Sequence, residues 1–220
     1  FGSSVYFVPI AAFFLPFDQV LGLTALFHLF SNTTKIGLFR KGLDKKLLLN
    51  IGIPSVVCVV MGSWLSGRFD ALMLEWILYS FLLLLALVML YRPDWRMEAS
   101  LNNGIAGGAL SGFAAGLLGT GGAIRGLTMS AYTMSIQGFV ATSAAIDLGV
   151  DLARSIVYFE EGYMAGPQLI YVPVLLIISV AGSYIGKQML AYFSVDSFRK
   201  FSLGSILVIA IAGVLKLWFQ

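Results

Sequence analysis

The apolar residues of this sequence run in long unbroken stretches, and the polar residues gather between them. A helix that spans a membrane needs about 20 predominantly apolar residues. Six stretches have this length: 18–39, 47–66, 71–91, 137–159, 166–190 and 198–219. A membrane β-barrel would alternate apolar and polar residues, whereas runs such as "SFLLLLALVML" do not alternate. The pattern therefore predicts an all-α polytopic membrane protein.

Two shorter apolar pieces, 102–118 and 123–135, lie before the fourth stretch and are joined by "GTGG". The second piece is short for a complete crossing, and the glycines favour a tight turn. We therefore expect a re-entrant hairpin, which enters the membrane and returns to the same face.

The charges in the loops support the hairpin. The basic loops 40–46 and 91–100 are expected on the cytoplasmic side, where Lys and Arg accumulate. The segments around Arg68 and at 159–162 then lie on the opposite side. Because residue 100 and the start of the stretch 137–159 are both inside, the chain between them must cross an even number of times, as a hairpin does.

The two halves of the chain resemble each other at a spacing of 119 residues. The spacing pairs Gly2 with Gly121, Thr24 with Ser143, His28 with Asp147, Asn32 with Asp151, Lys35 with Arg154 and Pro54 with Pro173. Each half, 1–97 and 98–220, is then one hairpin followed by three spans. An odd number of spans inverts the second copy, so we predict an inverted repeat, a common plan of secondary transporters. The first arm of the first hairpin is expected to precede residue 1.

Composition agrees with a lipid environment. The chain is 59% hydrophobic and 11% charged, with a mean hydropathy of +0.90, whereas soluble domains are about 45–50% apolar and about 25% charged. The net charge of +3 resides in the loops between helices, so it bears on topology and does not indicate nucleic-acid binding.

A site for an anion is predicted at the tip of the hairpin. A helix that begins inside the membrane presents unpaired N–H groups and the positive end of its dipole. Gly119, Gly121 and Gly122 let the backbone approach a ligand, and Arg125 adds a fixed charge with a planar donor fork. Gly2 and Ser3 are expected to contribute from the first copy. The alternative is that the glycines serve close helix packing alone.

A polar helix follows the hairpin. Asp147, Asp151 and Arg154 share one face of the stretch 137–159. Asp151 and Arg154 either neutralise each other or act directly, and Asp147 is either a proton carrier or the partner of Arg125. His28, the only histidine, is either a proton-coupling group or a hydrogen-bonded interior residue.

Four further polar residues, Asn32, Thr24, Thr142 and Ser143, either donate hydrogen bonds to the anion or hold helices together. We assign Thr142 and Ser143 to anion binding and Asn32, with the titratable groups, to coupling or gating. Catalysis has little support, since no G-x-S-x-G or H-E-x-x-H motif occurs. One His and one Cys are too few for a usual zinc site, so we expect no enzyme, no metal and no cofactor.

The segments "AGLLGTGGAIRG" and "GFVATSAAIDLGVDLARSIVYFEEG", with a degenerate copy at "GSSVYFVPI" and "LGLTALFHLFSNTTKIGLFRKG", resemble the TauE/SafE family of sulfite and organosulfonate exporters. The resemblance covers nearly the whole chain. Arg125 occupies a position where such proteins often carry an apolar residue.

The resemblance implies a secondary carrier of the bacterial inner membrane that moves sulfur-containing oxyanions. The expected partners are therefore a small anion of the sulfite or sulfonate class and membrane lipid, and we leave homodimer formation open. The alternative functions are an anion channel and, with less support, an intramembrane hydrolase that uses His28.

Overall fold

All regular elements are helices in the computed structural model, which describes residues 3–39, 42–92, 97–189 and 195–219. In chain order they are α1 (Ser4–Ala11), α2 (Phe17–Leu38), α3 (Lys45–Ser66), α4 (Ala71–Tyr91), α5 (Leu101–Leu118), α6 (Gly122–Ser130), α7 (Ile136–Glu160), the 3-10 helix η1 (Pro167–Tyr171), α8 (Val172–Met189) and α9 (Val195–Trp218). Each of the six apolar stretches forms a helix within a few residues of its expected bounds. The all-α prediction is confirmed.

Five helical segments of the described chain are long and apolar enough to cross a membrane: Lys45–Ser66, Ala71–Tyr91, Ile136–Glu160, Pro167–Gln188 and Phe201–Trp218. The sixth expected span, α2, has 22 residues but is not among them. Polar residues such as Thr24, His28 and Asn32 interrupt its apolar sequence, and their side chains are buried. α2 therefore contributes polar groups to the interior of a polytopic membrane protein.

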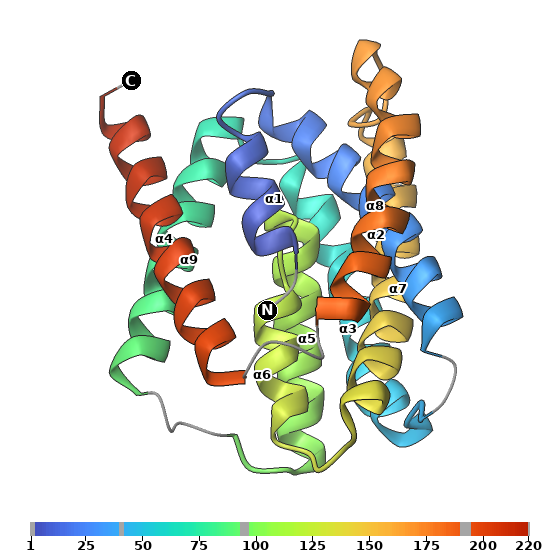
Figure 1. Cartoon of the computed structure of the whole chain (residues 1–220). Helices are drawn as coiled ribbons and strands as arrows, with labels where there is room; N and C mark the ends of the chain where they lie inside the picture. The colour runs from blue at the N-terminus through green and yellow to red at the C-terminus, as the bar shows by residue number, and fades with distance from the viewer. Residues whose placement is uncertain (1–2, 40–41, 93–96, 190–194, 220) are drawn as a thin grey trace.

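The helix ends gather at two faces (Figure 1). α2 ends, α3 begins, α4 ends and α5 begins at the lower face of that view, whereas α3 ends, α4 begins and α7 ends at the upper face. The basic residues Lys45 and Lys46 lie at the lower face, at the start of α3. We therefore take the lower face to be the cytoplasmic one, following the distribution of positive charge.

Four helices begin at a side chain that accepts hydrogen bonds from their first turn. Asp44 caps α3 and Asp70 caps α4, while Ser100 and Ser135 cap α5 and α7. Such a cap contributes about 1 kcal/mol. The starts of these helices are thus fixed by local sequence.

α5 and α6 form the re-entrant hairpin, because the chain enters α5 and leaves α6 at the lower face (Figure 1). Gly119 ends α5 with a φ of 73°, a left-handed conformation that favours glycine. A Cβ at this position would also lie 2.9 Å from the side chain of Leu21. Thr120, the next residue, is only 1% exposed. The tip of the hairpin therefore lies inside the protein.

Three glycines of α5 explain how closely it packs against α3. A Cβ at Gly108, Gly112 or Gly116 would collide with carbonyl oxygens on successive turns of α3. The hydroxyl of Ser55 in α3 donates to the carbonyl oxygen of Gly108 at 2.9 Å. These contacts are the small-xxx-small packing of membrane helices. Close packing also explains one of the tip glycines, because a Cβ at Gly121 would collide with the carbonyl oxygen of Ser111 in α5, whereas Gly119 shapes the turn.

Helix bounds recur at the spacing of the expected repeat. Shifted by 119 residues, α1 and α2 would occupy 123–130 and 136–157, close to the observed bounds of α6 and α7. α1 runs from the centre of the molecule to the upper face, whereas α6 runs to the lower face (Figure 1). These features support a duplication. The inversion and the division at residue 97 stay predictions.

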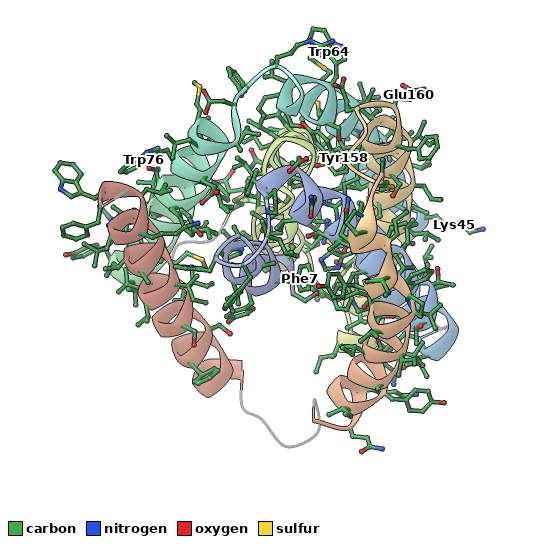
Figure 2. All side chains as sticks on the ribbon, turned by 90° about the horizontal axis from the view of Figure 1, so that it is seen from above. Phe7, Lys45, Trp64, Trp76, Tyr158 and Glu160 are labelled. Carbon is green, nitrogen blue, oxygen red and sulfur yellow. The ribbon has the colours of Figure 1, made fainter. Side chains whose placement is uncertain are left out.

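The outer surface is suited to lipid. Large apolar side chains such as Leu84, Ile156 and Ile177 are more than 60% exposed. Figure 2, which looks down on the molecule, has Trp64 at the periphery and Tyr158 in the interior. The buried apolar residues form two clusters, one mainly between α1, α2, α4, α5 and α9 and the other mainly between α3, α5 and α7.

Candidate functional site

Two adjoining cavities lie beside the hairpin tip. The large cavity has a volume of about 440 Å³ and is lined by α2, α6, α7 and α8 together with Ser3. The small cavity, of about 40 Å³, is lined by the hairpin tip, α2, α7, Ser3 and Ser4. Arg125, Asp147, Lys35 and Gly122 line both. The predicted hairpin site is therefore a hollow region with charged walls.

The first turn of α6 faces this region with free backbone donors. Gly121 and Gly122 line the small cavity, and the first backbone bond of α6 joins Arg125 N–H to the carbonyl oxygen of Gly121 at 3.1 Å. Within the described residues, the N–H groups at 121–124 have no acceptor. On the other side of the tip, the hydroxyl of Ser4 donates to that of Thr120 at 3.3 Å. The starts of α1 and α6 thus meet here.

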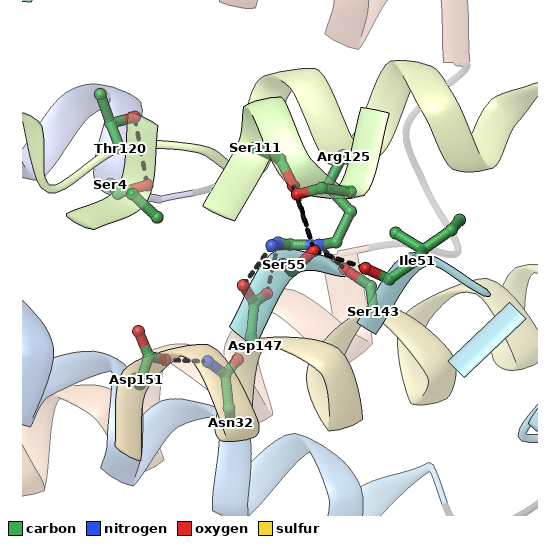
Figure 3. A network of polar contacts seen from close by, with 12 residues as sticks. Ser4, Asn32, Ile51, Ser55, Ser111, Thr120, Arg125, Ser143, Asp147 and Asp151 are labelled. Carbon is green, nitrogen blue, oxygen red and sulfur yellow. Dashed lines mark hydrogen bonds and ion pairs between the residues drawn. The ribbon is translucent and has the colours of Figure 1, made fainter. Parts of the chain in front are cut away.

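Arg125 is 4% exposed and bound to α7 (Figure 3). Its terminal nitrogens each lie 2.5 Å from a carboxylate oxygen of Asp147. Its Nε donates to the hydroxyl of Ser143 at 3.2 Å. Of the two roles weighed for Asp147, the ion pair with Arg125 is thus present in the structure.

A second ion pair contacts the hairpin tip. Arg154 lies 2.7 Å from Asp151, which also accepts a hydrogen bond from Asn32 at 2.7 Å. Arg154 further donates to the carbonyl oxygens of Ala115 and Gly119, each at 3.2 Å. Of the two alternatives considered for Asp151 and Arg154, the ion pair in which each neutralises the other is therefore present. Because Asn32 and Asp151 are 119 residues apart, positions matched by the repeat are in direct contact.

His28 and Lys35 bring further titratable groups from α2. His28 lines the small cavity, is 7% exposed, and its Nε2 is buried with no hydrogen-bond partner among the described residues. Lys35 donates to the side-chain oxygen of Asn32 at 3.1 Å. A buried nitrogen without a partner is unfavourable, and its place in the cavity wall makes the Nε2 of His28 available to a molecule in the small cavity.

The structure gathers most residues expected at the site. Gly119, Gly121, Gly122, Arg125, Ser143, Ser3, His28, Asp147, Asp151, Arg154 and Asn32 each line at least one cavity. Thr142 lines neither, because its hydroxyl accepts a hydrogen bond from the backbone N–H of Asp44 at 2.9 Å. Gly2 lies outside the described residues.

Three serines line the large cavity and were missing from the expected set: Ser31, Ser179 and Ser183. The hydroxyls of Ser31 and Ser183 lie 3.3 Å apart, which joins α2 to α8. Ser179 and Ser183 are spaced four residues apart in an apolar helix, so they share one face. That spacing was the available signal for a polar face on α8.

Comparison with known proteins identifies a family for the chain. The family model described as "Sulfite exporter TauE/SafE" matches residues 1–213. No curated protein and no solved structure matches the chain. The resemblance found in the hairpin and the polar helix is thus confirmed over almost the entire length. Since this match covers 213 of 220 residues, the chain belongs to the sulfite exporter TauE/SafE family of multi-pass membrane transporters.

Proposed function

We propose that the protein is a secondary transporter of the bacterial inner membrane that moves a small sulfur oxyanion, sulfite or an organosulfonate. The anion binds at the starts of α6 and α1, beside Arg125. Transport is coupled to protons through Asp147 or His28. Movement of α2 and α8 against the closely packed α3 and α5 exposes the site alternately to the two sides.

The observation that carries this proposal is the buried guanidinium of Arg125 at the start of a helix that begins inside the protein. Free N–H groups and the helix dipole favour negative charge at this end of α6. Arginine adds a permanent charge and a fork of donors that matches the oxygens of sulfite and sulfonates. Packing alone gives no reason to bury such a charge.

The cavities fit anions of this size. A cavity needs roughly 10–15 Å³ on the same measure to hold one water molecule. The small cavity, at about 40 Å³, therefore suits a compact group such as a sulfite or the head of a sulfonate. The large cavity, which contains Phe27, Phe139 and Ile178, suits an organic substituent. Lys35 and the first turns of α7 line the large cavity. Their position supports access of the anion from the cytoplasmic face.

Counterflow in proteoliposomes tests this function. Vesicles loaded with unlabelled sulfite should accumulate labelled sulfite in a saturable manner, and added organosulfonate should compete. Arg125→Ala should weaken anion binding about 10- to 100-fold, because a hydrogen bond to a charged group contributes about 1.5–3 kcal/mol. The matched control is Arg68→Ala. Arg68 is half exposed and pairs with Glu161 at 3.5 Å near the end of α3, so this variant should keep normal uptake.

Two outcomes would contradict the proposal. Anion flux without saturable counterflow would identify a channel, which lacks alternating access. Equal sulfite binding by the wild type and by a folded Arg125→Ala protein would remove Arg125 from the site. Gel filtration and circular dichroism of the variant establish that it is folded.

A further inference from the structure

The guanidinium of Arg125 is already occupied in the structure. Asp147 faces its two terminal nitrogens, each at 2.5 Å, and Ser143 accepts from its Nε at 3.2 Å (Figure 3). A carboxylate in this geometry uses the same bidentate edge that an oxyanion would use. A substrate that binds the fork of Arg125 must therefore displace Asp147.

The ion pair also stands between the two cavities. Arg125 and Asp147 line both of them. Asp147 has a side chain that is 22% exposed, whereas Arg125 is 4% exposed. The carboxylate is thus the partner that can rotate into the large cavity, while Arg125 stays in place.

The surrounding charges determine what the displaced carboxylate does. Lys35 and His28 face it from α2, Arg125 from α6, and Asp151 and Arg154 lie one and two turns further along α7. From α8, the described polar lining consists of the hydroxyls of Ser179 and Ser183. Arg154 is bound by Asp151 and by two backbone carbonyls, and Lys35 binds Asn32.

The residues that line the two cavities include three cations, Lys35, Arg125 and Arg154, and two carboxylates, Asp147 and Asp151. Their formal charges sum to +1 when His28 is neutral. An anion with one negative charge changes this sum, unless a proton enters with it. An ionised carboxylate that loses its partner in a buried site is costly and takes up a proton instead. Binding one anion together with one proton leaves the net charge of the site unchanged.

We infer that Asp147 is an internal competitor of the substrate, which occupies Arg125 in the empty protein and releases it when a proton binds to Asp147. This inference rests on the proposed function, since it takes Arg125 as the anion-binding residue. It assigns the proton coupling to Asp147, and not to His28. Each anion that binds to Arg125 takes one proton with it.

The direction of the pH dependence follows from this competition. Lowering the pH favours protonated Asp147 and so favours the anion. Raising the pH restores the ion pair and weakens binding. Where one proton is taken up with each anion, affinity falls by up to about tenfold per pH unit.

Methanesulfonate is a suitable probe, because a sulfonate stays fully ionised over the range in which sulfite itself titrates. Calorimetry of the purified protein, from about pH 5.5 to about pH 8.5, gives the pH slope of the affinity. The same titration in two buffers of different ionisation enthalpy gives the number of protons taken up by the wild type. The variants are Asp147→Asn, which keeps the shape of the side chain, and Glu161→Gln, a matched control whose carboxylate pairs with Arg68 away from the cavities.

The wild type and Glu161→Gln should bind more weakly as the pH rises and take up close to one proton per anion. Asp147→Asn should bind with an affinity independent of pH and without proton uptake. A pH slope that persists in Asp147→Asn, or wild-type binding without proton uptake, would overturn the inference while leaving the proposed function intact. Absence of binding of both methanesulfonate and sulfite by the folded wild type would instead overturn the proposed function. Wild-type binding without proton uptake would overturn the inference even if Asp147→Asn does not fold.

Discussion

Replacing Arg154 with methionine should destabilise the protein by removing the charge that joins α7 to the hairpin tip. The guanidinium is 2% exposed and lies 2.7 Å from Asp151. It also donates to the carbonyl oxygens of Ala115 and Gly119. Methionine has a similar length and fills much of the same space, so the change tests the charge and its hydrogen bonds more than the volume.

The expected loss can be worked out from these contacts. Removing one partner of a buried ion pair costs about 3–5 kcal/mol. A buried carbonyl oxygen left without a donor adds about 1–3 kcal/mol. Tyr158 has one hydroxyl proton, and its closer contact is with the carbonyl oxygen of Gly116 at 2.5 Å, so the carbonyl oxygens of Ala115 and Gly119 both lose their donor. The total is on the order of 5–11 kcal/mol.

A second variant separates the two contributions. Asp151→Asn combined with Arg154→Met removes the unpaired carboxylate and keeps an acceptor for Asn32, which donates to Asp151. The double variant should recover about 3–5 kcal/mol relative to Arg154→Met, because no uncompensated charge remains. The unpaired carbonyls of Ala115 and Gly119 should keep it below the wild type.

Unfolding by sodium dodecyl sulfate in mixed micelles, followed by tryptophan fluorescence, measures these differences. The control is Arg68→Met, whose pair with Glu161 is exposed and should contribute less than about 1 kcal/mol. The reasoning is refuted if Arg154→Met is as stable as Arg68→Met. It is equally refuted if the double variant is no more stable than Arg154→Met.

Two further predictions concern packing and topology. Gly112→Ala should cost about 1–3 kcal/mol in the same unfolding assay, because its Cβ would meet the backbone of α3. The control, Gly204→Ala, should be neutral, since no atom lies within 4 Å of the added Cβ. Equal losses of stability in the two variants would argue against the packing account. The topology is tested by single cysteines in a Cys58→Ala background. Lys45→Cys and Glu160→Cys should react with a membrane-impermeant maleimide from opposite sides of the membrane. Labelling of both from one side would contradict the assigned topology.

The helices were predictable because lipid imposes a simple requirement. A spanning helix needs a continuous apolar stretch of about 20 residues, and α3, α4 and α7 follow such stretches to within two residues. The hairpin was predictable for a related reason, since the glycine cluster marks a turn between two short helices. α2 is the case where hydropathy is least informative, because its buried polar residues serve the cavities.

The site was predictable only where spacing along one helix determines contact. Asp151 and Arg154 are three residues apart on α7 and form their pair directly. Arg125 and Asp147 lie on different helices, 22 residues apart, so the sequence left two roles open for Asp147. Thr142 is a residue whose contact could not be predicted from spacing, because its hydroxyl accepts a hydrogen bond from the backbone N–H of Asp44. That contact depends on how the loop before α3 folds over α7, which no periodicity encodes.

The glycine contacts between α3 and α5 restrict which parts of the protein can move. Backbones that touch at three successive turns can neither slide nor tilt without steric overlap, so α3 and α5 must travel together as one rigid unit. α8 is different, since it packs mainly against α2 and its Gly182 and Gly186 have no atom within 4 Å of an added Cβ. α3 and α5 therefore form a fixed block, and we expect any rearrangement of the helix packing to occur on the side of α2 and α8.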